Sequence, residues 1–282
     1  MKEYERIRYE IPEPGIARVV LDRDEKRNAQ DKKMLYEIND AFNQACWDDD
    51  IKVIVLASDG KDFSSGHELG VSFNSPMGDP IGTWGGSRSP GAEGVLGTEQ
   101  EIFVNLCWRW RNIPKPMIAQ VQGRVIAGGL MLVWPCDLIV ASDDAKFSDP
   151  TVAFGLNGHE FFVHVWELGA RRAKELLFTG GSISAEEAHA IGMVTRVVPR
   201  EDLESATMEL ARTIAQQPMI GLKLAKQAVN QSQDAQGIWT AVQAGYSLHL
   251  AAHTHAMVVH GGKPIDRDGK RKIRELSGAA QP

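Results

Sequence analysis

The chain has few cysteines, no excess of positive charge and no long apolar run, and each shortage excludes a class of protein. Cys46, Cys107 and Cys136 are its only cysteines and form no CxxC pair, so we expect buried thiols in a reducing cytoplasm and no cysteine-ligated zinc. Lys and Arg number 31 against 37 Asp and Glu, a net charge of −6, which argues against nucleic acid or an anionic membrane as the main partner. The charged start MKEYERIRYE is not a signal peptide, and no run reaches the ~20 apolar residues of a spanning helix. These features predict a cytoplasmic protein.

The remaining composition is typical of a folded α/β protein. Hydrophobic residues make up 43% of the 282 residues and charged residues 24%. This length suits one large domain, or a core with a smaller C-terminal piece. The order of the patterns predicts a core of repeated ββα units over residues 1–200, followed by a helical region over residues 201–282.

Local patterns place the first elements. Residues 5–10 and 16–22 resemble two short strands joined across Pro14-Gly15, as in a hairpin. IKVIVLAS (51–58) is a continuous β-branched run, the pattern of a strand covered on both faces. An amphipathic helix around residues 33–49 separates them, so strand, helix and strand form a crossover, which is nearly always right-handed.

Loops and helices alternate through the rest of the chain. Residues 71–98 are rich in Gly, Ser and Pro and predict a long mobile loop, and residues 99–112 predict an amphipathic helix. Residues 184–191 predict a helix with Ser184 as N-cap and Glu187 at capping-box spacing. We expect further helices over 162–178, 201–216, 219–231 and 235–259, and a charged tail that is frayed at its end.

Two glycine-containing turns carry the first functional signal. Phe63–Leu69 (FSSGHEL) follows a buried strand, and Ala127-Gly128-Gly129 precedes a short helix. Neither turn alone is strong evidence of a ligand site. Small residues at the start of a helix leave backbone N–H groups open to an anion, but they do no more than that. If the two turns converged on one oxygen, their N–H groups would form an oxyanion hole.

Three motifs in order resemble the enoyl-CoA hydratase/isomerase (crotonase) superfamily. They are FSSGHELG, AGGLMLVWPCDLIVASDDAKFSDP and GARRAKELLFTGGSISAEEAHAIGMVTRVVP, and the resemblance runs from about Tyr9 to about Gln231. It implies a crotonase-like spiral of repeated ββα units with a helical C-terminal trimerisation region. The implied assembly is a homotrimer or a dimer of trimers.

The resemblance also implies a ligand. It implies an acyl-CoA thioester or related carbonyl compound, with coenzyme A as part of the substrate and no separate cofactor. The N–H groups of His67 and Gly128 would polarise the thioester carbonyl and stabilise an enolate. The substrate-binding residues that we expect are Lys26, Arg27, Ala29, Ser65, Gly66, Leu69, Trp84, Ala127, Met131 and Thr151.

The sequence departs from the family pattern where proton transfer is expected. Family hydratases carry one glutamate three residues after the oxyanion glycine and another directly after the proline of the next loop. In this chain those positions hold Met131 and Thr151. Neither side chain is a carboxylate, so hydration of a C=C bond by two glutamates is not expected.

Three residues of the following loop are candidates for the missing acid or base. The resemblance implies a carboxylate near this point, as in relatives with other reactions such as carbon–carbon bond hydrolysis, and Glu160 fits it best by its spacing from Gly155. His159 and Asp149 are the other candidates. The alternative for Glu160 is that it caps the helix that follows, since acidic residues suit a helix N-terminus.

The remaining aromatic and histidine residues each have two interpretations. The His67 imidazole points into the site or belongs only to the turn, and Glu68 faces solvent or pairs with a base. Trp84 is a candidate lid over the acyl chain, whereas Trp108, Trp110, Trp134 and Trp166 fall on helices and are expected in the core.

His249 and His253 are four residues apart on one predicted helix, with Tyr246 and His255 nearby. This spacing suits a metal, but the sequence offers no third ligand, so packing or a subunit contact is favoured and no metal is expected.

Three functions stay open on the sequence. The first is an enzyme of the enoyl-CoA hydratase/isomerase family, with true hydratase activity not expected. The second is a hydrolase of a diketone or thioester that uses Glu160 and His159. The third is a non-catalytic acyl-CoA-binding protein.

Overall fold

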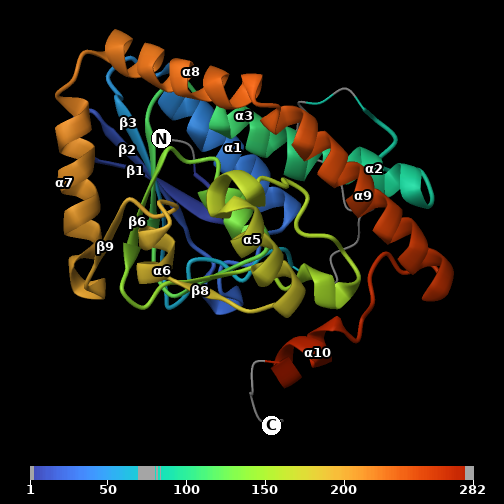
Figure 1. Cartoon of the computed structure of the whole chain (residues 1–282). Coiled ribbons are helices and arrows are strands. Elements are labelled where there is room, and N and C mark those ends of the chain that lie inside the picture. The colour runs from blue at the N-terminus through green and yellow to red at the C-terminus, as the bar shows by residue number, and fades with distance from the viewer. Residues whose placement is uncertain (1–2, 69–79, 81, 83, 277–282) are drawn as a thin grey trace.

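A six-stranded sheet lies at the centre of the computed structural model, which describes residues 3–68, 80, 82 and 84–276 (Figure 1). The first two strands are antiparallel and the others follow in parallel. In spatial order the strands are β1 (Ile7–Glu13), β2 (Ile16–Leu21), β3 (Val53–Ser58), β4 (Met117–Val121), β6 (Leu138–Ser142) and β9 (Arg196–Val198). A smaller sheet contains β5 (Arg124–Ile126), β7 (Lys146–Ser148) and β8 (Ile183–Ser184).

The strand β3 is covered on both faces, as its apolar run predicts. Val53 and Val55 pack in a cluster with residues of α7 (Leu203–Ala215), whereas Ile54 and Leu56 belong to the main core on the other face. Alternate side chains of a strand point to opposite faces, so a strand between two apolar layers needs apolar residues throughout. The expected hairpin is also confirmed, since β1 pairs antiparallel with β2.

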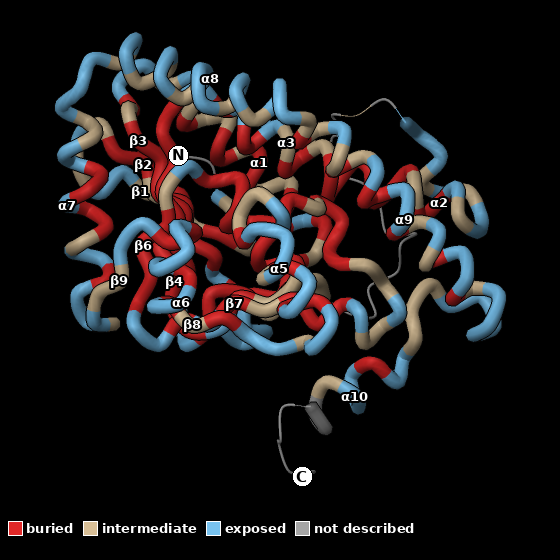
Figure 2. Tube along the Cα trace, in the orientation of Figure 1, coloured by how far each residue is buried: buried red, intermediate tan, exposed pale blue. Residues whose placement is uncertain are grey.

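Helices cover both faces of the main sheet. α7 lies against one face, and α8 runs across the top of the molecule in Figure 1. None of the residues of α8 is buried, and Figure 2 shows its pale outer surface. The helices are α1 (Lys32–Trp47), α4 (Gly128–Val133), α5 (His164–Thr179), α6 (Ala185–Ala190), α8 (Met219–Ala235), α9 (Ile238–Val259) and α10 (Gly269–Leu276), with short 3-10 helices η1 (Asp24–Lys26), η3 (Thr151–Phe154) and η4 (Arg200–Asp202). α6 has the predicted capping box between Ser184 and Glu187.

The prediction of a loop over residues 71–98 is wrong at the C-terminal end of that segment. Helix α2 (Ala92–Glu99) lies there and continues into a π-helix, η2 (Gln100–Asn105), and then α3 (Leu106–Arg111), so the helix predicted over 99–112 begins earlier. Helix propensity does not predict α2, because the segment contains glycines and glycine disfavours helix. Here they permit close packing, since a Cβ on Gly94 or Gly97 would lie 2.1 Å from a backbone oxygen of the preceding loop.

One smaller expectation is also wrong. Cys46 is half-buried, whereas Cys107 and Cys136 are buried as predicted. The charged tail contains α10, and the fraying expected at its end falls on residues 277–282, which lie outside the described part. Among the residues that the structure describes, no helix is long and apolar enough to cross a membrane.

Candidate active site

The first turn of the site follows β3 and ends at His67. Ser64 donates its N–H to Arg124 O at 3.2 Å and accepts from Ile126 N at 3.0 Å, so the turn lies alongside β5. Gly66 has φ +87°, and a Cβ there would lie 2.7 Å from Ile126 O. Only glycine meets both conditions, and the chain therefore passes close to β5 before it reaches His67.

The second turn contains a strained alanine. Ala127 has φ 45° and ψ −103°, a region that residues with a Cβ rarely occupy, and it is the N-cap of α4. Its N–H donates to Ser148 O at 2.8 Å, which fixes the turn to β7. Strain of this kind costs on the order of 1–3 kcal/mol and is found where the surroundings enforce a functional geometry.

The two turns bring the N–H groups of His67 and Gly128 together, as the sequence predicts. A Cβ built on Gly128 would lie 3.0 Å from His67 N. The side-chain amide of Gln30 joins the turns, since its Nε2 donates to Gly128 O at 2.8 Å and to Ser64 Oγ at 3.2 Å. Within the described residues neither N–H group donates to a protein acceptor. Neither donor is therefore satisfied by the described part of the chain.

The His67 ring lies over the oxyanion turn. It stacks on Phe103 with 3.8 Å between ring centroids, and its Nδ1 lies 3.7 Å from Glu160 Oε1. Burial, with a smaller effect of His249, lowers the pKa of His67 to about 3. The imidazole is thus neutral at pH 7 and points toward the site, as one of the two interpretations predicts.

Glu160 lies at the centre of the candidate site. Glu160 is 5% exposed, and its Oε1 lies 3.6 Å from His249 Nε2 on α9. Burial, together with the nearby charge of Glu99, raises the pKa of the Glu160 carboxyl well above its ordinary value. The alternative that Glu160 caps a helix is wrong, because α5 begins at His164, Val163 is its N-cap and no side chain caps it.

Asp149 is fully engaged by hydrogen bonds. Its carboxylate accepts from Thr151 N and Oγ1, from His159 N and from His164 Nε2, the last at 2.8 Å. Burial alone would raise the pKa of Asp149, but these bonds and the neighbouring histidines lower it well below its ordinary range. A carboxylate held in this way positions the loop and is a weak proton acceptor. Sequence reasoning did not identify His164, which carries no motif signal.

His159 is buried beside His164 and Trp134. Its ring centroid lies 4.5 Å from that of His164 and 5.1 Å from that of Trp134. Neither ring nitrogen has a hydrogen-bond partner among the described residues. Burial, and then the charge of His164, lowers the pKa of His159 well below its ordinary value.

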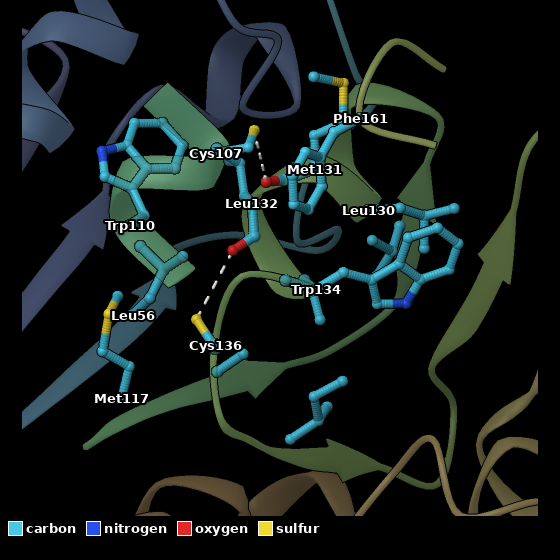
Figure 3. Packing of buried hydrophobic residues seen from close by; sticks show 14 of the residues in the cluster. Leu56, Cys107, Trp110, Met117, Leu130, Met131, Leu132, Trp134, Cys136 and Phe161 are labelled. Atoms are coloured by element: carbon cyan, nitrogen blue, oxygen red, sulfur yellow. Dashed lines mark hydrogen bonds between the residues drawn. The ribbon is translucent and has the colours of Figure 1, made fainter. Parts of the chain in front are cut away.

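Met131 and Thr151 are the residues at which the family resemblance led us to look for glutamates, and neither carries an acid. Met131 is 2% exposed and belongs to the main core; Figure 3 shows it near Phe161 and the hydrogen bond from Cys107 Sγ to its carbonyl, at 3.3 Å. Thr151 Oγ1 donates to Asp149 at 2.7 Å. One position is thus apolar and the other supports Asp149.

The expected coenzyme A segment lies beside the first turn. Ala29 N–H donates to Lys26 O at 3.1 Å, and Ala29 O accepts from Arg23, so both its backbone groups already have partners. Lys26 and Arg27 are exposed, and Ser65 N–H donates to Arg27 O. Glu68 pairs with Arg23 at 2.8 Å, so the paired alternative for Glu68 is the one observed.

Trp84 lines a pocket that none of the other candidate residues lines. It is 58% exposed, and Gly82, Gly97 and Glu101 are among its neighbours in that pocket. Leu69 lies outside the described residues. Of the tryptophans expected in the core, Trp110 and Trp134 are buried, and Trp108 and Trp166 pack against the core from its edge.

On α9, His249 and His253 are buried and His255 is exposed. The structure also brings Glu99, at the end of α2, to these two histidines. Sequence reasoning missed Glu99 because it precedes His249 by 150 residues and lies in a segment without helix signal.

Several known proteins are similar to this chain in sequence and in fold. The family model described as enoyl-CoA hydratase/isomerase matches residues 12–85 and 91–261. EchA13 of Mycobacterium tuberculosis, which carries the provisional name enoyl-CoA hydratase, is 43% identical over 270 residues, covering 93% of this chain and 85% of that protein. The crystal structure of a probable enoyl-CoA hydratase from Mycobacterium smegmatis has a TM-score of 0.84 at 44% identity, covering 92% of this chain and 99% of the other. An enoyl-CoA hydratase/isomerase from Xanthobacter autotrophicus Py2 has a TM-score of 0.79 at 29% identity, covering 99% and 100%.

Proposed function

This chain belongs to the enoyl-CoA hydratase/isomerase family, and on that basis we propose that it binds an acyl-CoA thioester and stabilises the enolate of the acyl group. The observation that carries the proposal is the pair of N–H groups on His67 and Gly128, which have no protein acceptor within the described residues. Two such donors on a thioester oxygen stabilise negative charge that develops there.

Glu160 is the proton acceptor in this proposal. Removal of a proton from the carbon next to the carbonyl breaks a C–H bond, and the electron pair moves to the oxygen held by the two N–H groups. The proton goes to the Glu160 carboxylate and returns to carbon when the enolate collapses. A carboxyl whose pKa is raised by burial holds that proton more readily than an exposed one.

Geometry favours Glu160 over the other two candidates. Asp149 already accepts four hydrogen bonds, so protonating it would break the bonds that hold Thr151, His159 and His164. The His159 ring packs against the rings of Trp134 and His164, whereas the Glu160 carboxyl faces the His67 ring. We therefore assign Asp149 and His159 to positioning of the loop.

Proton transfer or isomerisation suits this site better than hydration. The usual addition of water needs a second carboxylate, and Met131 and Thr151 supply none. Lys26 and Arg27, both exposed beside the first turn, are the cations that we propose for coenzyme A phosphates. The cytoplasmic, trimeric protein expected from the sequence agrees with this function.

Exchange of the acyl α-protons tests the proposal directly. Butyryl-CoA incubated with the protein in D2O is expected to lose its α-proton NMR signal, and Glu160→Gln should slow this exchange by about 10²–10⁴-fold. Glu175→Gln, which changes an exposed glutamate of α5, is the matched control and should leave the rate unchanged.

The same assay separates the alternatives. Exchange that persists in Glu160→Gln would refute Glu160 as the base. Release of free coenzyme A thiol from butyryl-CoA would identify a hydrolase. Tight binding of butyryl-CoA by the wild-type protein, with neither exchange nor thiol release, would identify a binding protein and overturn the catalytic proposal.

A further inference from the structure

A carboxylate and two imidazoles meet between the end of α2 and the middle of α9. Glu99, His249 and His253 are 1%, 1% and 3% exposed, so this cluster is sealed from solvent. One oxygen and two ring nitrogens lie within 4.8 Å of one another, and Glu99 Oε1 is 3.1 Å from His253 Nε2. The two histidines are four residues apart on α9, which places them on one face of the helix.

Backbone carbonyls determine which nitrogen of each ring faces the cluster. His249 Nδ1 lies 2.9 Å from Gly158 O, and His253 Nδ1 lies 2.5 Å from Pro264 O. A carbonyl only accepts, so each Nδ1 carries a proton and donates it. The Nε2 atoms are then left toward the carboxylate. Histidines that bind metals in proteins are held in the same way, with the second nitrogen donating to a carbonyl or carboxylate.

The atoms that face one another in this cluster are unsatisfied. Glu99 Oε2, His249 Nε2 and His253 Nε2 are buried without a hydrogen-bond partner among the described residues. Buried polar atoms are normally paired, since leaving one unpaired costs roughly 1–3 kcal/mol. When both imidazoles are neutral, the Nε2 lone pairs and the carboxylate that they face repel one another, and a proton or a metal ion between them removes that repulsion.

A second cluster in the same protein shows the contrast. Asp149, His159 and His164 also lie within 4.8 Å of one another. There both carboxylate oxygens accept hydrogen bonds from the protein, including one from His164 Nε2 at 2.8 Å. That carboxylate is satisfied by the chain itself, whereas Glu99 Oε2 is not.

We propose that Glu99, His249 and His253 bind one divalent transition-metal ion, with Zn²⁺ as the best match. Two imidazoles and one carboxylate are a common three-residue zinc set, with a fourth position for water or another ligand. Ligand atoms about 2.0 Å from a tetrahedral ion lie roughly 3.3 Å apart, close to the 3.1 Å between Glu99 and His253. The ion joins α2 to α9 beside Glu160, whose Oε1 is 3.6 Å from His249 Nε2.

This ion has a structural role in the proposal. α2 contains two glycines, Gly94 and Gly97, and follows a segment rich in glycine and serine, so its own helix propensity is low. A bond from its last residue to α9 would hold it in place. Glu99, His249 and His253 lie outside both glycine turns, so metal binding to them can be measured without acyl-CoA.

Cobalt and zinc titrations of the tag-free, full-length protein after chelator treatment test the site. We expect one Co²⁺ per chain, with the visible absorption of a four-coordinate ion, and its displacement by Zn²⁺. Glu99→Gln and His253→Gln should each weaken binding by at least about tenfold. His255→Gln, on the same helix but exposed, is the matched control and should bind as the wild type does.

A second measurement covers variants that fail to fold. X-ray absorption of the zinc-loaded wild type should show nitrogen and oxygen neighbours at about 2.0–2.1 Å, including two imidazoles, and no sulfur. The proposal is overturned if no metal binds at millimolar concentration, which would leave an imidazolium–carboxylate pair between His253 and Glu99. It is equally overturned if folded Glu99→Gln binds Co²⁺ as tightly as the wild type.

Discussion

The Nδ1 atom of His67 lies 3.7 Å from Oε1 of Glu160, and the same ring covers Gly128. One side chain thus contacts both parts of the proposed machinery, the N–H donors and the carboxyl group. Its backbone supplies a donor, and its ring occupies the space that a Cβ on Gly128 would need. A side chain at position 128 would therefore displace this ring.

Gly128→Ala is expected to abolish the oxyanion hole with little loss of fold. The new Cβ would lie 2.3 Å from His67 Cδ2 and 2.5 Å from its Nε2, so the ring and its backbone must move. Loss of one oxyanion donor costs about 10²–10³ in rate, measured here as α-proton exchange of butyryl-CoA. Gly221→Ala is the matched control, because a Cβ there meets no atom within 4 Å, and α8 should gain up to about 1 kcal/mol. Unchanged exchange in Gly128→Ala would contradict the assignment.

Restoring the first family glutamate should destabilise the protein. Met131 is 2% exposed in the main core, and the Met131→Glu variant would bury a carboxylate beside Phe161 and Cys107. We expect a loss of roughly 3 kcal/mol in the free energy of unfolding, measured with urea. The size-matched Met131→Leu should lose less than about 1.5 kcal/mol. Equal stability of the two variants would show that this position can hydrate a carboxylate.

Stability should fall as the pH drops below 6.5, with His159 as one cause. Its pKa is lowered in the folded protein, so below an unfolded pKa of 6.5 the unfolded chain binds a proton that the folded chain does not. This stabilisation is present above pH 6.5 and decreases as the pH falls. Between pH 7.5 and 5.5 one such histidine accounts for roughly 1 kcal/mol. Urea unfolding of His159→Gln at both pH values should show a smaller difference than the wild type, and an equal difference would refute the assignment.

The trimer predicted from the family resemblance can be tested on α8. Ile220 and Leu224 are 65% and 57% exposed in the single chain, which is unusual for side chains of this size. Light scattering should give three times the chain mass of 31.0 kDa, or six times that mass for a dimer of trimers. The Ile220→Lys, Leu224→Lys double variant should dissociate, whereas Glu175→Gln should not. A monomeric wild type would refute the expectation.

Periodicity predicts the regular elements of this chain better than it predicts the site. The run over β3 and the capping box at Ser184 reveal their structures because the physical causes are local. α2 escapes prediction because Gly94 and Gly97 are chosen for close packing against the preceding loop and not for propensity.

The site divides in the same way. Met131 and Thr151 are placed by counting from family motifs, and the two oxyanion turns by their glycines. The partners of the buried histidines cannot be obtained in this way, since Glu99 reaches His253 only after α2 and α9 pack together. His164 reaches Asp149 through a loop that shows no periodic pattern.

The amide of Gln30 has a consequence for selectivity. Because its Nε2 donates to both Ser64 Oγ and Gly128 O, it links the two turns and restrains the gap between their N–H groups. When two donors are held at one spacing, only an acceptor atom of matching size can hydrogen-bond to both. A thioester oxygen would be accepted, whereas the larger thiocarbonyl sulfur of a dithioester analogue would be held too far from at least one donor. The spacing of the two donors would therefore select an oxygen atom over a sulfur atom at this position.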